Sequence, residues 1–162
     1  MTIRIAYYSW KGHTRKVAEM VSAELVSKGS TTELVAIEPA QPFHVAAGAM
    51  RAFFKRTSPI RPCSTDMANT DALIIATPVW VGKIPPFVSE YLSSVTNGAG
   101  KPFYVIAEMG GGGADGAIAL VRKHLEAKGM RFISSLVTVE KDVDGGTIGA
   151  AVSKFSGEIG KP

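Results

Sequence analysis

The 162-residue sequence contains a single cysteine, Cys63, so it has neither an internal disulfide nor a cysteine-based zinc cluster. Long apolar runs are also missing. The longest stretch without Asp, Glu, Lys or Arg covers Pro39 to Met50, well short of the ~18 apolar residues of a membrane helix. A strand-like run follows Met1 almost at once, so we expect no signal peptide. With 46% hydrophobic and 20% charged residues, the composition excludes a disordered chain and predicts one soluble, cytoplasmic domain over residues 1–162.

Acidic residues are absent between Glu38 and Asp66, a stretch that holds the basic segment Arg51–Arg61. We interpret this segment as a solvated helix face, because basic residues without patterned aromatics are common on helices. The alternative is a local positive field that attracts an acidic partner or a phosphorylated ligand. No helix-turn-helix, zinc or RNA-binding signature accompanies it, so we expect no nucleic-acid partner.

Strand-like apolar runs alternate with helical patterns along the chain. The predicted strands cover residues 3–8, 32–37, 72–76, 101–107 and 132–139, and the predicted helices cover 14–28, 45–56, 87–95, 118–125 and 148–159. Gly29 and Gly129 mark helix ends, and Thr147 is a candidate cap for the last helix. This alternation predicts an α/β domain of three layers, with helices on both faces of a doubly wound, parallel five-stranded sheet.

In a sheet of this kind, ligands bind beyond the carboxyl ends of the strands, near the point where the strand order switches. The loops that follow the first, third and fourth predicted strands therefore form the candidate site. They are Ser9–Thr14, Thr77–Pro86 and Glu108–Gly116.

The first loop reads SWKGHT (residues 9–14) and leads straight into a helix. Its hydroxyl groups, the charge of Lys11, a glycine that permits positive φ and the unpaired N–H groups of the helix N-terminus all suit a phosphate. The order differs from a Walker loop, because lysine precedes glycine and the first glycine is missing. An ordinary turn with a Ser or Thr cap is the alternative interpretation.

This loop resembles the phosphate loop of the flavodoxins, whose pattern runs Ser/Thr-x-Thr-Gly-x-Thr. Ser9, Gly12 and Thr14 match the pattern, whereas Lys11 stands where the family usually has a hydroxyl residue. The order and length of nearly all elements are also similar to those of the family. The resemblance implies a short-chain flavodoxin-like fold with strand order 2-1-3-4-5 and noncovalently bound FMN. Two positions of the Lys11 ammonium are then open: it either contacts and strengthens the binding of the phosphate, or it points into solvent.

The second loop reads TPVWVGKIPP (residues 77–86) and looks like the flavodoxin segment beside the isoalloxazine ring. Trp80 offers a face that can stack on a flat aromatic ligand, and Gly82 lets the backbone approach it. A buried tryptophan that fills a gap at the sheet edge is the alternative. Lys83 stands where several flavodoxins carry an acid, and a positive charge near the reduced ring raises its potential. This position argues against a strongly reducing one-electron carrier.

The third loop reads EMGGGGADG (residues 108–116), and the resemblance places its backbone N–H groups on the other side of the flavin. Gly111, Gly113 and Gly116 also satisfy the dinucleotide pattern G-x-G-x-x-G, with Glu140 at the end of the next strand. We favour the flavin interpretation, because consecutive glycines match that spacing easily and the dinucleotide pattern normally opens its sheet. A flexible flap without a ligand is a third possibility.

The resemblance thus implies a set of cofactor-binding residues. It implies no catalytic side chain and no metal ligand. The set consists of Ser9, Trp10, Lys11, Gly12, His13 and Thr14 at the phosphate, Pro78, Val79, Trp80, Val81, Gly82 and Lys83 beside the ring, and Glu108, Met109, Gly110, Gly111, Gly112 and Gly113 on its far side.

Two function classes follow from FMN binding. One is an electron carrier that works between redox partner proteins, and the other is an enzyme that takes hydride from NAD(P)H and reduces a quinone, a flavin or a similar small acceptor. The net charge of +4 and Lys83 favour the enzyme, since carriers of this family tend to be acidic. The short chain, without a clear nicotinamide-binding addition, favours the carrier. A binding module that has lost its flavin is a third class. Cys63, His44 and His124 lack activating or ligating neighbours, so we expect packing or surface roles for them.

Overall fold

Five parallel strands form the centre of the computed structural model, which describes residues 1–41 and 57–160. The strands are β1 (Thr2–Tyr7), β2 (Thr31–Ala36), β3 (Ala72–Pro78), β4 (Pro102–Met109) and β5 (Arg131–Val139). The described helices are α1 (His13–Ser27), α3 (Pro86–Ser94), α4 (Ala114–Glu126), α5 (Glu140–Asp144) and α6 (Gly149–Ser156). The strand order β2-β1-β3-β4-β5 confirms the predicted fold.

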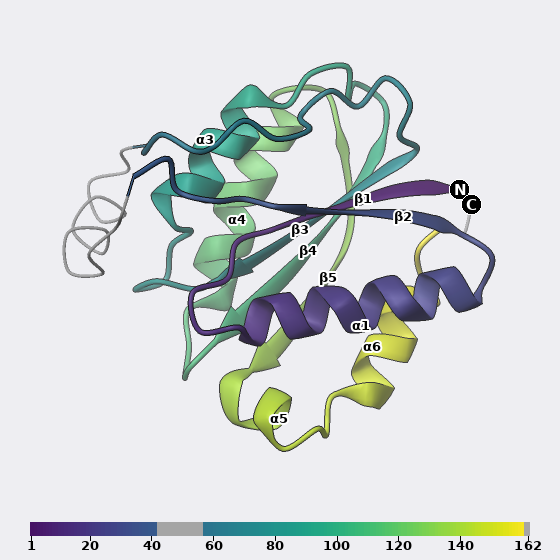
Figure 1. Cartoon of the computed structure of the whole chain (residues 1–162), viewed down its shortest axis with the longest axis vertical. Helices are drawn as coiled ribbons and strands as arrows, with labels where there is room; N and C mark the ends of the chain where they lie inside the picture. Colours follow the sequence, from purple (N-terminus) through teal and green to yellow (C-terminus); the bar gives the residue numbers. More distant parts are fainter. Residues whose placement is uncertain (42–56, 161–162) are drawn as a thin grey trace.

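Helices cover the sheet on both faces, with α3 and α4 on one side and α1, α5 and α6 on the other (Figure 1). Strand β3 shows why its apolar sequence requires this arrangement. Leu73 and Ile75 belong to the core under α3 and α4, whereas Ile74 and Ala76 belong to the core under α1 and α6. Because successive side chains of a strand point to opposite faces, a strand buried on both faces must be apolar throughout.

The predicted elements agree with the observed ones to within a few residues at their ends, with two differences. The short helix α5 was not predicted, because one helical turn has too little periodicity to detect. Thr147 does not cap α6, so that prediction was wrong. Ile148 occupies the N-cap position without a side-chain hydrogen bond, and Thr147 Oγ1 instead donates to the carbonyl of Asp142 (3.3 Å). The predicted helix over 45–56 lies outside the described residues.

The topology brings the three candidate loops to one edge of the sheet. Strand β1 lies between β2 and β3. The chain passes from β1 to β2 on one side of it, and then crosses to β3 on its other side. This reversal between β1 and β3 is the switch point at which the loops after β1, β3 and β4 meet.

Candidate functional site

The first loop closes on itself before it enters α1. Gly12 has a φ of 96°, in the left-handed region that favours glycine, and its N–H donates to Ser9 Oγ (3.1 Å). No side chain of the described residues caps the N-terminus of α1. The first-turn N–H groups and the positive end of the helix dipole therefore face the loop, and this donor set suits a phosphate.

Acidic side chains from α5, which directly follows β5, contact the basic side chains of this loop. The Lys11 ammonium lies 2.9 Å from Glu140 Oε1. The His13 ring lies between two carboxylates, with Nδ1 3.3 Å from Glu140 Oε1 and Nε2 2.9 Å from Asp144 Oδ1. The hydrogen bond with Glu140 raises the pKa of Lys11. The Glu140 carboxylate thus contacts both Lys11 and His13, the two side chains of this loop that are best placed to contact a phosphate.

A third acid lies beneath the loop. Glu108, near the end of β4, is only 7% exposed and accepts a hydrogen bond from Thr14 Oγ1 (3.4 Å). Burial is the main cause of the raised pKa of Glu108, because the charged form of a carboxyl is disfavoured away from water. The floor of the site is therefore a carboxyl group that holds its proton more tightly than a carboxyl in water does.

The second loop makes a tight turn at its tip. Trp80 N–H donates to the Lys83 carbonyl (2.8 Å) and Lys83 N–H donates to the Trp80 carbonyl (3.0 Å). Between them, Val81 and Gly82 have φ angles of 52° and 70°, as the two central residues of a type I′ turn require. The Trp80 ring is half-buried and meets the Tyr8 ring edge-on, with the centroids 5.8 Å apart. The turn therefore holds the indole against the protein at the rim of the candidate site.

The third loop packs backbone to backbone against this turn, and the contact explains two of its glycines. A Cβ on Gly113 would lie 2.7 Å from the Gly82 Cα, and a Cβ on Gly116 would overlap the Gly82 carbonyl oxygen. Two glycines of the dinucleotide pattern are thus required by packing. Glu140, the acid of that pattern, contacts Lys11 and His13 instead. These positions favour the flavin interpretation of the third loop.

The three loops enclose a hollow of about 150 Å³. The predicted site residues that line it are Ser9, Trp10, Lys11, His13, Thr14, Pro78, Val79, Trp80, Glu108 and Gly110. The remaining predicted residues do not line it: Gly12, Val81, Gly82, Lys83, Met109, Gly111, Gly112 and Gly113. Glu140 lines the hollow although it was not a predicted FMN-binding residue. Its place directly after β5, at the edge where the loops meet, was the available signal.

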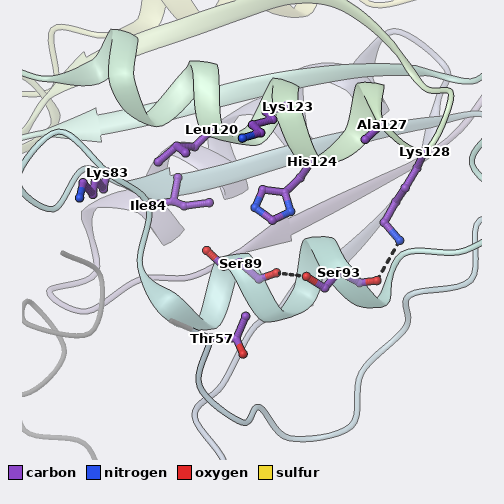
Figure 2. A pocket seen from close by; sticks show the side chains of 10 residues that line it. All are labelled: Thr57, Lys83, Ile84, Ser89, Ser93, Leu120, Lys123, His124, Ala127 and Lys128. Atoms are coloured by element: carbon purple, nitrogen blue, oxygen red, sulfur yellow. Dashed lines mark hydrogen bonds between the residues drawn. The ribbon is translucent and has the colours of Figure 1, made fainter. Parts of the chain in front are cut away.

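Other residues singled out in the sequence lie apart from this hollow. Lys83 lines a larger pocket between α3 and α4 (Figure 2). Burial raises the pKa of Cys63, as expected for a thiol without a reactive role. Arg61 pairs with Glu38 at 3.2 Å, whereas His44 and the rest of the basic segment lie outside the described residues. Within residues 1–41 and 57–160, no group of His, Cys, Asp and Glu side chains has the arrangement of a metal site.

Solved structures share this architecture over nearly the whole chain. A flavoprotein in complex with FMN from Lactobacillus acidophilus NCFM is 20% identical, with a TM-score of 0.71 over 89% of this chain and 97% of that chain. A cysteine-to-serine variant of flavodoxin from Pseudomonas aeruginosa is 16% identical, with a TM-score of 0.64 over 99% and 100%. Azoreductase AzrA is 13% identical, with a TM-score of 0.60 over 98% of each chain. These likenesses show that the fold is flavodoxin-like.

The family follows from the sequence match. The family model described as NADPH-dependent FMN reductase matches residues 5–144, which include all three candidate loops. The chain belongs to the NADPH-dependent FMN reductase family, and this membership supports FMN as its cofactor. No match was found among curated protein sequences. None of the helices in the described part of the chain has the length and apolar character needed to cross a membrane.

Proposed function

We propose that the chain binds FMN in the hollow where the three loops meet and reduces it with NADPH. The observation that carries this proposal is the family match, which spans every loop around the hollow. When bound, FMN supplies the redox chemistry, and the chain contributes binding, orientation and electrostatics. The first loop and the N-terminus of α1 hold the phosphate, while Trp80 flanks the ring.

The side chains around the first loop fit a phosphate only after a rearrangement. Lys11 and His13 supply donors and charge, but Glu140 contacts both of them. We infer that an incoming phosphate competes with the Glu140 carboxylate for these two side chains. Burial raises the pKa of Glu108, and this disfavours the charged form of the carboxyl beneath the loop. FMN binding is thus coupled to the breaking of internal contacts.

An electron carrier is the second candidate function. The similarity to a flavodoxin over 99% of this chain favours it. A carrier exchanges single electrons with a partner protein and does not react quickly with NADPH. The net charge of +4 favours the reductase.

Two measurements on the purified full chain test the proposal. We expect yellow protein that releases FMN on acid treatment, and a colourless chain that fails to take up added FMN would contradict FMN binding. Anaerobic NADPH should then bleach the yellow protein promptly, whereas a carrier would stay yellow over minutes. Lys11→Gln should weaken FMN binding more than riboflavin binding, because riboflavin lacks the phosphate. Equal losses for both flavins would show that Lys11 does not contact the phosphate.

We also propose that residues 1–162 form one domain and that the protein works in the cytoplasm. The single five-stranded sheet supports one domain, and the single cysteine suits a reducing compartment. Limited proteolysis followed by mass spectrometry tests the first point, and cell fractionation tests the second.

A further inference from the structure

A groove of about 510 Å³, larger than the hollow at the first loop, lies between α3 and α4 (Figure 2). It is separate from the hollow at the first loop, and the two share no lining residue. Four basic side chains line it: Lys83 from the second loop, and Lys123, His124 and Lys128 from the C-terminal half of α4 and the residues after it. No acidic side chain lies among the described residues of its wall.

The charges of this groove are only partly satisfied within the protein. Lys128 donates to the carbonyls of Ser93 and Val95 at 2.8 and 2.9 Å, so its ammonium caps the end of α3. Lys123 is exposed and makes no hydrogen bond or ion pair with any described residue. Burial lowers the pKa of His124, and the charges of Lys123 and Lys128 lower it further. A wall of this kind attracts an anion.

The groove also has an apolar part. Ile84 is 3% exposed and lies beside Leu120 at one end of the groove, whereas Ala127 lines the other end, near Lys128 (Figure 2). A ligand that fits has a flat apolar portion and at least one phosphate, which is the chemistry of a nucleotide. On the opposite wall the Ser89 hydroxyl offers a further hydrogen bond, whereas the Ser93 hydroxyl donates to the Ser89 carbonyl (2.9 Å) (Figure 2).

The groove is connected to the proposed flavin site through one turn. Lys83 lines the groove, and its backbone pairs with Trp80, which lines the hollow at the first loop. The turn that holds Trp80 at the hollow therefore also brings Lys83 to the groove. The chain belongs to a family that uses NADPH, a ligand with a reactive ring at one end and a phosphate-bearing adenosine at the other.

We propose that the groove between α3 and α4 binds the phosphate-bearing adenosine half of NADPH. This proposal rests on the proposed function, because it assigns a place to the substrate of that reaction. Lys123 and His124 contact the phosphate, and Ile84 and Leu120 contact the adenine.

The test uses adenosine 2′,5′-bisphosphate as the probe and the full chain saturated with FMN, so that the first loop is already filled. NMR of the histidine rings reports the binding position, because the chain has only three histidines and His124→Gln assigns the signal. We expect the bisphosphate to move the His124 resonance and to raise the pKa of His124 towards its ordinary value. We expect Lys123→Gln to weaken the bisphosphate about fivefold or more. Lys154→Gln, an exposed change on α6 at the other face of the sheet, should leave binding unchanged.

Three outcomes would overturn the groove assignment. In the first, the His124 resonance does not respond while that of His13 does, which would place the probe at the first loop. In the second, inorganic phosphate binds as tightly as the bisphosphate, which would indicate a general anion site. In the third, Lys123→Gln and Lys154→Gln behave alike.

Kinetics with NADPH separate failure of the groove from failure of the reductase. If the groove is correct, Lys123→Gln raises KM for NADPH and leaves kcat unchanged. An unchanged KM in an active enzyme contradicts the groove alone. A chain that binds the bisphosphate at His124 but does not oxidise NADPH contradicts the proposed reaction alone.

Discussion

Replacing Glu140 with glutamine keeps the shape of the side chain and removes its charge, so it isolates the contacts with Lys11 and His13. The Lys11 and Glu140 side chains are 56% and 30% exposed, so water screens their ion pair and its contribution is modest. The His13 contact at 3.3 Å adds a second modest contribution. A phosphate that must break both contacts therefore binds about fivefold more weakly than one that meets no carboxylate. We therefore expect Glu140→Gln to bind FMN about fivefold more tightly than the parent chain.

Quenching of FMN fluorescence at pH 7.5 and low ionic strength measures this change. Riboflavin lacks the phosphate, so its affinity should stay constant. Asp142→Asn is the matched control, because it removes a charge from the same helix, α5, at a residue that does not line the hollow. At about 1 M salt, where the screening length falls to ~3 Å, the gain should shrink. The same gain for both flavins, or the same gain in Asp142→Asn, would refute competition between Glu140 and the phosphate.

Three further changes test the electrostatics and packing around the site. The pKa of Glu108 is higher in the folded chain than in the unfolded chain. The free energy of unfolding therefore falls as the pH rises from the unfolded pKa through the folded pKa, because ionising the buried carboxyl is unfavourable. Glu108→Gln should therefore unfold at higher urea than the parent at pH 8, by about 1 kcal/mol, and the difference should vanish near pH 4; a constant difference would contradict this. Gly116→Ala should destabilise the chain by about 1–3 kcal/mol in thermal unfolding, although the residue is helical, because the new methyl group meets the Gly82 carbonyl oxygen. The control is Gly149→Ala in α6, where the new methyl group meets no atom and should not destabilise the chain. Val81→Asn places Asn-Gly in the turn and should raise the free energy of unfolding by about 1 kcal/mol, because valine at a φ of 52° is strained; an unchanged Tm would show that the turn stores no strain.

The fold could be predicted from the sequence because its signals are local. The run ALIIA is apolar at every position, and only a strand covered on both faces accommodates that pattern. Gly29 and Gly129 adopt the positive φ angles of 83° and 77° expected where helices end. Thr147 shows the limit of such signals. Its residue type suits a cap, but the additional turn of α5 moved the start of α6 and left the hydroxyl to bond Asp142.

The candidate site could be predicted only in outline. Loop positions follow from the alternation of strands and helices, and the hollow indeed lies at the ends of β1, β3 and β4. The roles of single residues within the loops do not follow from spacing. The sequence places Lys83 in the loop beside the predicted ring, and only the structure shows that it also lines the groove between α3 and α4.

The sequence by itself determined the class of fold and the three loops in which a phosphate and a flat ring can be held, because hydrophobic periodicity and glycine placement are properties of neighbouring residues. Only the tertiary structure decided which charges meet. Glu140 reaches Lys11 across 129 residues of chain, and Gly116 reaches Gly82 because their two loops leave adjacent strands. Such contacts depend on the register and curvature of the whole sheet, which no local pattern encodes.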